Sequence, residues 1–256
     1  MKAVILAGGL GTRLAEETIM KPKPMVNIGS NPILWHIMKI YHTFEVNEFI
    51  ICTGHKGYVI KEYFSNYFVH SSDVTFDLQM NSMTVHKKRA EDWKITIIDT
   101  GAESMTGGRL KRVSEFIGND TFFFTYGDGI GDIDISSTLK AHKTSGKEAT
   151  ITAVQPPGRY GALNIVGNNV TNFNEKPSGD GAWINGGFFV LEPSVLNYIK
   201  DDTTTWESSP LESLANKGEL NVFKHNGFWS SMDTIRDKLF LNDLWRTGKA
   251  PWKIWD

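Results

Sequence analysis

Near its start the chain reads Ala3-Val4-Ile5-Leu6-Ala7-Gly8-Gly9-Leu10-Gly11-Thr12-Arg13-Leu14, an apolar run that stops at glycines. Residues 3–6 predict a short buried β-strand, and the glycines predict a tight turn directly after it. Glycines in such a turn let backbone N–H groups approach an anion closely, and Arg13 adds a guanidinium group that can donate to phosphate oxygens. The alternative is a strand-to-helix turn without a ligand, and glycines alone do not decide between the two.

Strand and helix patterns alternate after this turn. Apolar residues at helical spacing predict a helix at residues 32–41. The further predicted strands are residues 49–53, 121–126, 149–154, 162–165, 170–173 and 187–191, and the further helices are residues 58–68, 108–117, 136–145 and 210–217. Residues 74–98 alternate between polar and apolar side chains, which predicts a small hairpin insertion or two strands that project from the sheet. This order predicts an α/β fold with a Rossmann-like, mixed and mostly parallel sheet flanked by helices.

The composition limits the partners and the location of the protein. Among 256 residues, 27 basic and 29 acidic side chains leave a net charge of -2, so no overall field attracts nucleic acid or a membrane surface. No apolar run approaches the roughly 20 residues of a membrane span, and the first run ends too early for a signal peptide. Cys52 is the only cysteine in the sequence, which excludes an internal disulfide. It lies in an apolar run, which predicts an ordinary strand residue. We expect one cytoplasmic domain.

A second rigid segment, Lys21-Pro22-Lys23-Pro24-Met25, follows the glycine turn. Its prolines fix the backbone around two lysines, which suits an ammonium group aimed at a phosphate better than a solvated surface. The dinucleotide fingerprint fails because Leu14 takes the place of its third glycine, and no Walker lysine with Ser or Thr follows. A dehydrogenase or a P-loop ATPase is therefore disfavoured.

The glycine turn and the Pro-Lys-Pro-Met segment together resemble the sugar-phosphate nucleotidyltransferase family. The resemblance implies an enzyme that uses Mg2+ to join a nucleoside triphosphate to a hexose 1-phosphate, with release of pyrophosphate. It implies that Gly8, Gly9, Gly11, Thr12 and Arg13 hold the nucleotide phosphates. The neighbouring Leu6, Ala7 and Leu10 are further nucleotide-binding candidates. The implied catalytic residues are Arg13, Lys23 and Asp128, with Lys23 offsetting charge around the attacked α-phosphate.

Two aspartates are the candidates for the metal site. Asp128 follows the predicted aromatic strand at its carboxyl end, where open α/β sheets bind ligands, although a turn or helix-cap role is about equally common there. Asp233 precedes a predicted helix near Ile235 and on sequence alone is as well explained as its cap. The family resemblance implies that both ligate Mg2+. Asp132 and Asp134 form a D-x-D pair, for which a helix-capping turn is the favoured interpretation.

Three motifs in the second half are candidates for sugar binding, namely Tyr160-Gly161, Glu175-Lys176-Pro177 and Asn185-Gly186-Gly187. On their own they indicate exposed turns with ordinary ion pairs. The resemblance implies a hexose phosphate site made of Gly161, Glu175, Lys176, Asn185 and Gly186. We therefore divide the domain, residues 1–256, into a nucleotide-binding half at 1–130 and a sugar-phosphate-binding half at 131–256.

The family resemblance implies that the residues at 99–110 recognise the base. The nucleotide-binding candidates there are Ser104, Thr106, Gly107, Gly108 and Arg109. Arg109 can donate to a pyrimidine carbonyl, the alternative being that it only starts a basic helix, and a backbone carbonyl or Glu103 can accept from a cytosine amino group.

Over nearly its whole length the chain resembles the members of the family that use CTP and glucose 1-phosphate. This implies CDP-glucose as the product, which supplies dideoxyhexose units of bacterial surface polysaccharide. An enzyme that uses UTP or dTTP, or a non-catalytic nucleotide-sugar-binding subunit, remains as an alternative, although such a subunit would be expected to have lost Lys23, Asp128 or Asp233. We also expect a homo-oligomer, with residues 74–98 and the aromatic tail 252–255 as candidate assembly surfaces.

Overall fold

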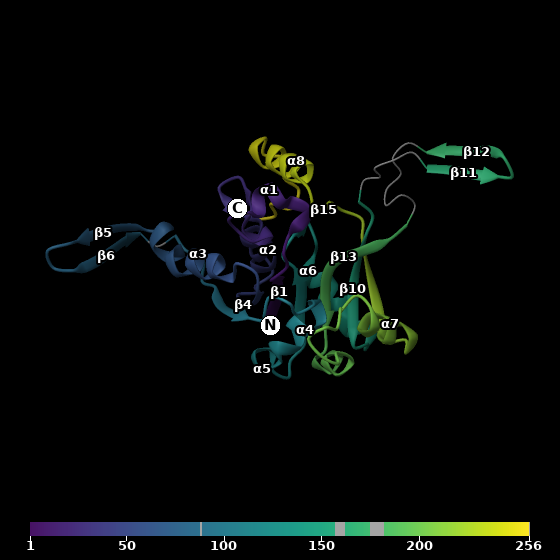
Figure 1. Cartoon of the computed structure of the whole chain (residues 1–256), viewed down its shortest axis with the longest axis horizontal. Coiled ribbons are helices and arrows are strands. Elements are labelled where there is room, and N and C mark those ends of the chain that lie inside the picture. Colours follow the sequence, from purple (N-terminus) through teal and green to yellow (C-terminus); the bar gives the residue numbers. More distant parts are fainter. Residues whose placement is uncertain (88, 157–161, 175–181, 256) are drawn as a thin grey trace.

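The computed structural model describes residues 1–87, 89–156, 162–174 and 182–255, and a seven-stranded sheet forms the centre of this part of the chain (Figure 1). The strand order is β14-β10-β13-β8-β1-β4-β7. These strands are β1 (Lys2–Ala7), β4 (Glu48–Thr53), β7 (Lys94–Asp99), β8 (Phe122–Tyr126), β10 (Ala149–Val154), β13 (Ile184–Leu191) and β14 (Leu220–His225). Four two-stranded sheets contain β2 (Asn27–Ile28), β3 (Asn31–Pro32), β5 (Asp73–Asp77), β6 (Ser82–Lys87), β9 (Gly129–Gly131), β11 (Ala162–Val166), β12 (Asn169–Asn174) and β15 (Trp229–Ser231).

Helices cover both faces of the central sheet (Figure 1). The α-helices are α1 (Ala15–Thr18), α2 (Ile33–His42), α3 (Gly57–His70), α4 (Thr106–Arg112), α5 (Ser114–Ile117), α6 (Ile135–Ser145), α7 (Ser209–Asn216) and α8 (Ile235–Arg246). Short 3₁₀ turns are η1 (Thr12–Leu14), η2 (Lys23–Met25) and η4 (Pro193–Tyr198). None of the helices in the described ranges is both long and apolar enough to cross a bilayer.

The strand pairing confirms the mixed, mostly parallel sheet. β1 is parallel to β4 and β8, β4 is parallel to β7, and β10 is parallel to β14, whereas β13 runs antiparallel to both β8 and β10. In this register Leu6 lies beside Cys52 on one side and Tyr126 on the other. The segments that follow β1 and β8, including the glycine turn and Asp128, therefore emerge at the same edge of the sheet, where ligands bind in open α/β sheets.

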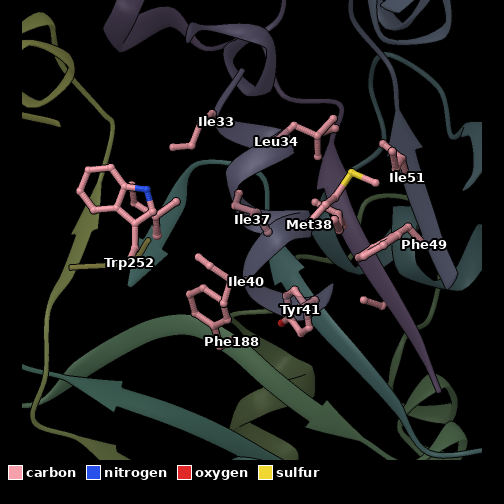
Figure 2. Packing of buried hydrophobic residues seen from close by; sticks show 14 of the residues in the cluster. Ile33, Leu34, Ile37, Met38, Ile40, Tyr41, Phe49, Ile51, Phe188 and Trp252 are labelled. Carbon is pink, nitrogen blue, oxygen red and sulfur yellow. The ribbon is translucent and has the colours of Figure 1, made fainter. Parts of the chain in front are cut away.

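Each face of the sheet packs against its own hydrophobic cluster. On one face α2 inserts Ile37 and Tyr41 against the sheet, and Trp252 from the end of the chain packs on the same cluster (Figure 2). On the other face Phe124 and Trp206 pack in a second cluster together with residues of α4, α5 and α7. Central parallel strands are buried on both faces, which explains why β1 and β4 consist of nearly continuous apolar runs.

The structure corrects the prediction for residues 74–98. Only β5 and β6 form the projecting hairpin, which extends beyond α3 (Figure 1). The last part of that range is β7, which joins the main sheet as an edge strand beside β4. Ile95 and Ile97 point toward the core, and the Trp93 ring packs edge-on against Phe49. Burial of these apolar side chains fixes the strand in the sheet, and a projecting position would leave them in water.

Other boundaries differ less. The helix predicted at residues 108–117 begins earlier and is divided into α4 and α5 at Val113. β14 and the short β9–β15 pair were not predicted from the sequence. Cys52 is fully buried in β4, as expected.

Candidate functional site

A cavity of about 460 Å³ opens at the carboxyl ends of β1 and β8. Of the residues predicted to bind nucleotide, its lining includes Leu6, Ala7, Gly8, Gly9, Gly11, Thr12, Lys23, Ser104, Thr106, Arg109 and Asp128. Leu10 is more than half exposed and is not part of that lining. The structure does not describe the side chain of Arg13. It also does not describe Gly161, Glu175 and Lys176. The roles predicted for these four residues therefore stay predictions.

The glycine turn is shaped by backbone conformation and close packing. Gly11 has a φ of +66°, which strains any residue with a side chain, and its carbonyl accepts from the N–H of Leu14 at 3.0 Å. At Gly8 a Cβ atom would lie 2.1 Å from Nη1 of Arg109, so a side chain there would collide with the guanidinium group. Gly11 therefore allows the backbone to turn after β1, and Gly8 leaves room for the Arg109 side chain of α4.

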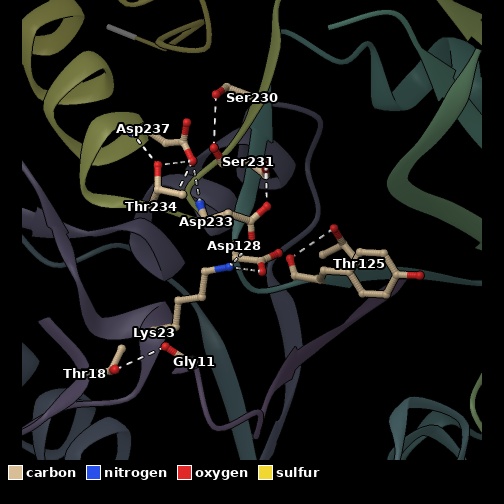
Figure 3. A network of polar contacts seen from close by, with 11 residues as sticks. Gly11, Thr18, Lys23, Thr125, Asp128, Ser230, Ser231, Asp233, Thr234 and Asp237 are labelled. Carbon is tan, nitrogen blue, oxygen red and sulfur yellow. Dashed lines mark hydrogen bonds and ion pairs between the residues drawn. The ribbon is translucent and has the colours of Figure 1, made fainter. Parts of the chain in front are cut away.

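Lys23 connects the two aspartates predicted to bind metal. η2, which contains Pro24, holds this lysine below the carboxyl end of β8, and its side chain is buried (Figure 3). Its ammonium group donates to Oδ2 of Asp128 at 2.6 Å and to Oδ1 of Asp233 at 2.7 Å. The structure thus brings together three residues that lie far apart in the sequence.

The charge of Lys23 follows from this geometry. Burial of the ammonium group by itself would lower the pKa of Lys23. The negative charges of Asp128 and Asp233 and their hydrogen bonds outweigh that effect, so the pKa lies above its ordinary value of 10.5. Lys23 is therefore a cation at neutral pH and neutralises part of the charge of the two carboxylates.

The structure excludes helix capping as the role of Asp233, and metal binding by its carboxylate stays a prediction. The N-cap of α8 is Thr234, whose hydroxyl accepts from the N–H of Asp237 in a capping box. Asp233 instead directs its carboxylate toward Lys23 and accepts from the hydroxyl of Ser231 at 2.9 Å (Figure 3). Helix capping therefore does not explain why an aspartate stands at position 233.

One member of the D-x-D pair, Asp134, has the helix-capping role that was favoured from the sequence. Asp134 caps α6, because its carboxylate accepts from the backbone and hydroxyl of Ser137 at 2.7 and 2.6 Å. Asp132 pairs with His225 at 2.9 Å.

The donor set of Asp128 and Asp233 fits a divalent cation held partly by substrate. Each contributes a carboxylate oxygen within 2.7 Å of one point, the Lys23 nitrogen, where a cation already lies between them. Mg2+ is commonly held by one or two carboxylates, with phosphate and water oxygens completing its octahedron. No group of three or more His, Cys, Asp or Glu side chains in the described ranges forms a metal cage, so such an ion would depend on phosphate oxygens.

Arg109 lines the cavity, and its terminal nitrogens already have acceptors. Nη1 donates to Thr53 O, Thr100 Oγ1 and Gly101 O, and Nη2 donates to Gly8 O and Ala102 O, at 2.7 to 3.1 Å. The C=O and the following N–H point in opposite directions in a trans peptide, so the bond to Gly8 turns the N–H of Gly9 away from Arg109. Arg109 therefore fixes the glycine turn, and its predicted contact with a base remains a prediction.

Gly107 and Gly108 do not line the cavity. They are buried where α4 meets the backbone of residues 202–204, and a Cβ on Gly108 would lie 2.4 Å from the carbonyl oxygen of Asp202. The need for close backbone packing thus accounts for these glycines without a ligand. Ser104 and Thr106 line the cavity on either side of Met105, and their predicted contact with a nucleotide stays a prediction.

The predicted sugar residues that the structure describes lie beside Tyr126. The amide of Asn185 donates to the Tyr126 hydroxyl at 3.2 Å, and the carbonyl of Gly186 accepts from the Trp229 indole at 2.7 Å. They come from the amino end of β13, which runs next to β8. Neither residue is part of the cavity lining, so their contact with a sugar stays a prediction.

Reasoning from the sequence missed several lining residues, namely Pro24, Met105, Tyr126, Gly127 and Glu207. Four of them, Pro24, Met105, Tyr126 and Gly127, lie one or two positions from predicted residues, so the motifs themselves indicate them. Glu207 belongs to the segment between β13 and α7, which has no recognisable motif. Its hydrogen bond with the Thr106 hydroxyl spans 101 positions, and the sequence gives no signal for it.

Comparison with known proteins gives consistent results. The Nucleotidyl transferase family model matches residues 2–232. The chain is 63% identical over 257 residues to a Salmonella typhi protein named glucose-1-phosphate cytidylyltransferase, and 44% identical over 256 residues to a Bacillus subtilis protein named probable glucose-1-phosphate cytidylyltransferase. Both alignments cover all of this chain and all of the relative.

Similar solved structures include a putative glucose-1-phosphate thymidylyltransferase from Bacillus anthracis and an apo UDP-glucose pyrophosphorylase. The first has a TM-score of 0.69 and 21% identity, and the alignment covers 96% of this chain and 95% of that one. The second has a TM-score of 0.70 and 14% identity, with 97% and 98% covered. At these identities the likeness establishes the shared fold.

Proposed function

The chain belongs to the nucleotidyl transferase family, and from this we infer that its cavity transfers a cytidylyl group from CTP to glucose 1-phosphate. The products are CDP-glucose and pyrophosphate. The observation that carries this assignment is the 63% identity, along the whole chain, to a glucose-1-phosphate cytidylyltransferase. CDP-glucose made here would supply dideoxyhexose units of bacterial surface polysaccharide.

The reaction proposed for the cavity is an in-line displacement. An oxygen of the sugar phosphate attacks the α-phosphorus of CTP, and pyrophosphate leaves from the opposite side. Such a transfer depends on positioning and charge neutralisation more than on proton transfer. The N–H groups of the glycine turn hold phosphate oxygens, and the fixed orientation of the Gly8–Gly9 peptide prepares this turn before the nucleotide binds.

Charge neutralisation would come from a metal ion and from the side chains of Arg13, Lys23 and Lys176. Asp128 and Asp233 would hold Mg2+, which when bound offsets negative charge on the phosphates. Lys23 lies between these carboxylates and lines the same cavity, so its ammonium group is within reach of a triphosphate. Lys176 would hold the attacking phosphate.

Release of pyrophosphate tests this function directly. We expect strong release with glucose 1-phosphate, Mg2+ and CTP, and much weaker release with UTP, dTTP or ATP. The Lys23→Ala variant should lose about 10²- to 10³-fold in turnover, as expected when a group that neutralises transition-state charge is removed. Lys21→Ala is the matched control, because Lys21 lies two positions away outside the cavity lining.

The other outcomes have definite meanings. Activity with UTP or dTTP in place of CTP would keep the family and overturn the base assignment. A folded Lys23→Ala protein with full activity would contradict the mechanism. No release with any nucleotide would favour a non-catalytic nucleotide-sugar-binding subunit, which is disfavoured because Lys23, Asp128 and Asp233 converge.

A further inference from the structure

A second carboxylate, that of Glu207, lines the cavity. Among the described lining residues only Asp128 and Glu207 are acidic. Asp128 is paired with Lys23, whereas Glu207 comes from a different part of the fold, the segment between η4 and α7. The function proposed above gives it no role.

Two hydroxyl groups orient Glu207. Thr106 Oγ1 donates to its Oε2 at 2.6 Å and itself accepts from the N–H of Trp206 at 2.9 Å. The hydroxyl of Tyr126 also makes a hydrogen bond with Glu207. A carboxylate has about four acceptor sites, so these two donors leave capacity for a ligand.

The segment that carries Glu207 is firmly attached to α4. The N–H of Met105 donates to Asp202 O at 2.8 Å, and the N–H of Gly108 donates to Thr204 O at 3.2 Å. Arg112 makes two hydrogen bonds to the Asp202 carboxylate at 2.8 and 2.5 Å. The absence of side chains on Gly107 and Gly108 allows this approach, so the position of Glu207 depends on them.

Glu207 contacts two other residues of the cavity lining, Thr106 and Tyr126. Thr106 belongs to the segment expected to bind the base, and Tyr126 comes two residues before Asp128 at the phosphate end. In a nucleotide the ribose joins the base to the α-phosphate. A nucleotide bound between the two ends would therefore have its ribose beside Glu207.

The charge of Glu207 agrees with this placement. A carboxylate repels phosphate groups but accepts hydrogen bonds from neutral hydroxyls, and acidic side chains bind ribose hydroxyls in the same way in other nucleotide sites. We propose that Glu207 accepts hydrogen bonds from the 2′- and 3′-hydroxyls of the ribose and so selects ribonucleotides over 2′-deoxyribonucleotides. This inference rests on the proposed binding of a nucleotide in this cavity.

The experiment compares CTP with 2′-deoxy-CTP in three proteins, the wild type, Glu207→Ala and Glu207→Gln. For each, kcat/KM is measured at saturating glucose 1-phosphate, and nucleotide affinity is measured separately by calorimetry. The wild type should prefer CTP by about 10- to 100-fold, the range for a hydrogen bond to a charged group. Glu207→Ala should lose more with CTP, where contacts to two hydroxyls disappear, than with 2′-deoxy-CTP, where only the 3′-hydroxyl contact disappears. Its preference for CTP should therefore fall toward 1, and Glu207→Gln should lose less because it keeps one acceptor.

Glu212→Gln is the control, because Glu212 lies exposed on α7 outside the cavity lining and should leave the preference unchanged. Equal losses with CTP and 2′-deoxy-CTP would overturn the inference and leave Glu207 as a support for Thr106. A changed CTP-to-UTP ratio with an intact ribose preference, or a change confined to the KM for glucose 1-phosphate, would overturn it as well. A wild type that neither binds nor turns over CTP would instead refute the proposed function.

Discussion

Lys23 is the residue on which the charge balance of the cavity depends. Its ammonium group lies within 2.7 Å of two carboxylates that come from segments 105 and 210 positions away. A divalent cation that bound both carboxylates would take the place of this ammonium group. In the absence of a nucleotide, Lys23 should therefore compete with a metal ion for Asp128 and Asp233.

Lys23→Met should strengthen metal binding by the nucleotide-free protein. Removal of the ammonium group leaves two carboxylates close together without their countercharge, and a cation then gains affinity, by about 10-fold or more for a close charge pair. The measurement is the decrease of the free Mn2+ signal in electron paramagnetic resonance titrations. Lys21→Met controls for the general loss of one positive charge, and equal Mn2+ affinity in wild type and Lys23→Met would show that no such competition exists.

At the scale of secondary structure elements, the contact between α4 and the segment at 202–204 positions one side of the cavity. Gly108→Ala would put a Cβ atom 2.4 Å from the carbonyl oxygen of Asp202, which cannot move aside as a flexible side chain can. We expect this variant to lose about 1–3 kcal/mol of unfolding free energy, as overpacked sites do.

The change is measured from the midpoint of urea unfolding. Gly9→Ala is the matched control, since a Cβ there meets no atom within 4 Å, and its midpoint should stay near that of the wild type. An unchanged midpoint for Gly108→Ala would mean that α4 and the segment separate easily.

The sequence predicted the elements whose own residues carry a clear pattern. β1, β4 and β8 are short, mostly apolar runs and β10 is a short run rich in β-branched residues, and the predicted and observed bounds of all four agree closely. β14 was missed because burial along it is irregular, and β9 and β15 because three residues are too few for a pattern. β7 was assigned to the projecting insertion because local alternation does not show which partner strand it joins.

The same distinction holds for the site. The glycine turn and Lys23 belong to contiguous motifs that the sequence shows directly, and most residues of the turn, together with Lys23, line the cavity. The pairing of Asp128 with Asp233 was expected only through the family resemblance, because neither aspartate is distinctive in its local sequence. Glu207 could not be found, since its position depends on packing between segments about a hundred residues apart.

At the scale of the whole molecule, the two halves of the chain share one sheet. β8 from the first half pairs with β13 from the second, and Trp252 packs in the cluster that also contains Ile37 of α2. We propose on this ground that residues 1–256 form a single domain, in which the nucleotide-binding and sugar-phosphate-binding halves name regions of one site.

The β5–β6 hairpin is an exception to this shared packing, since none of its residues belongs to either hydrophobic cluster. It is a two-stranded sheet that extends from the body (Figure 1), and Phe76, Leu78, Met80 and Met83 on it are all exposed. An isolated two-stranded hairpin has little stability in water. The predicted homo-oligomer would bury these apolar side chains against a second copy.

Hydrogen exchange in the hairpin would therefore show whether copies of the chain associate through it. Its backbone amides should exchange hydrogen for deuterium many times faster than those of β1 in dilute protein, because local opening breaks few contacts there. If copies of the chain associate through the hairpin, exchange there should slow as the protein concentration rises, while exchange in β1 stays constant. Fast exchange at every concentration would mean that the hairpin takes no part in assembly, and a time course of peptide masses would record the difference without any substitution in the chain.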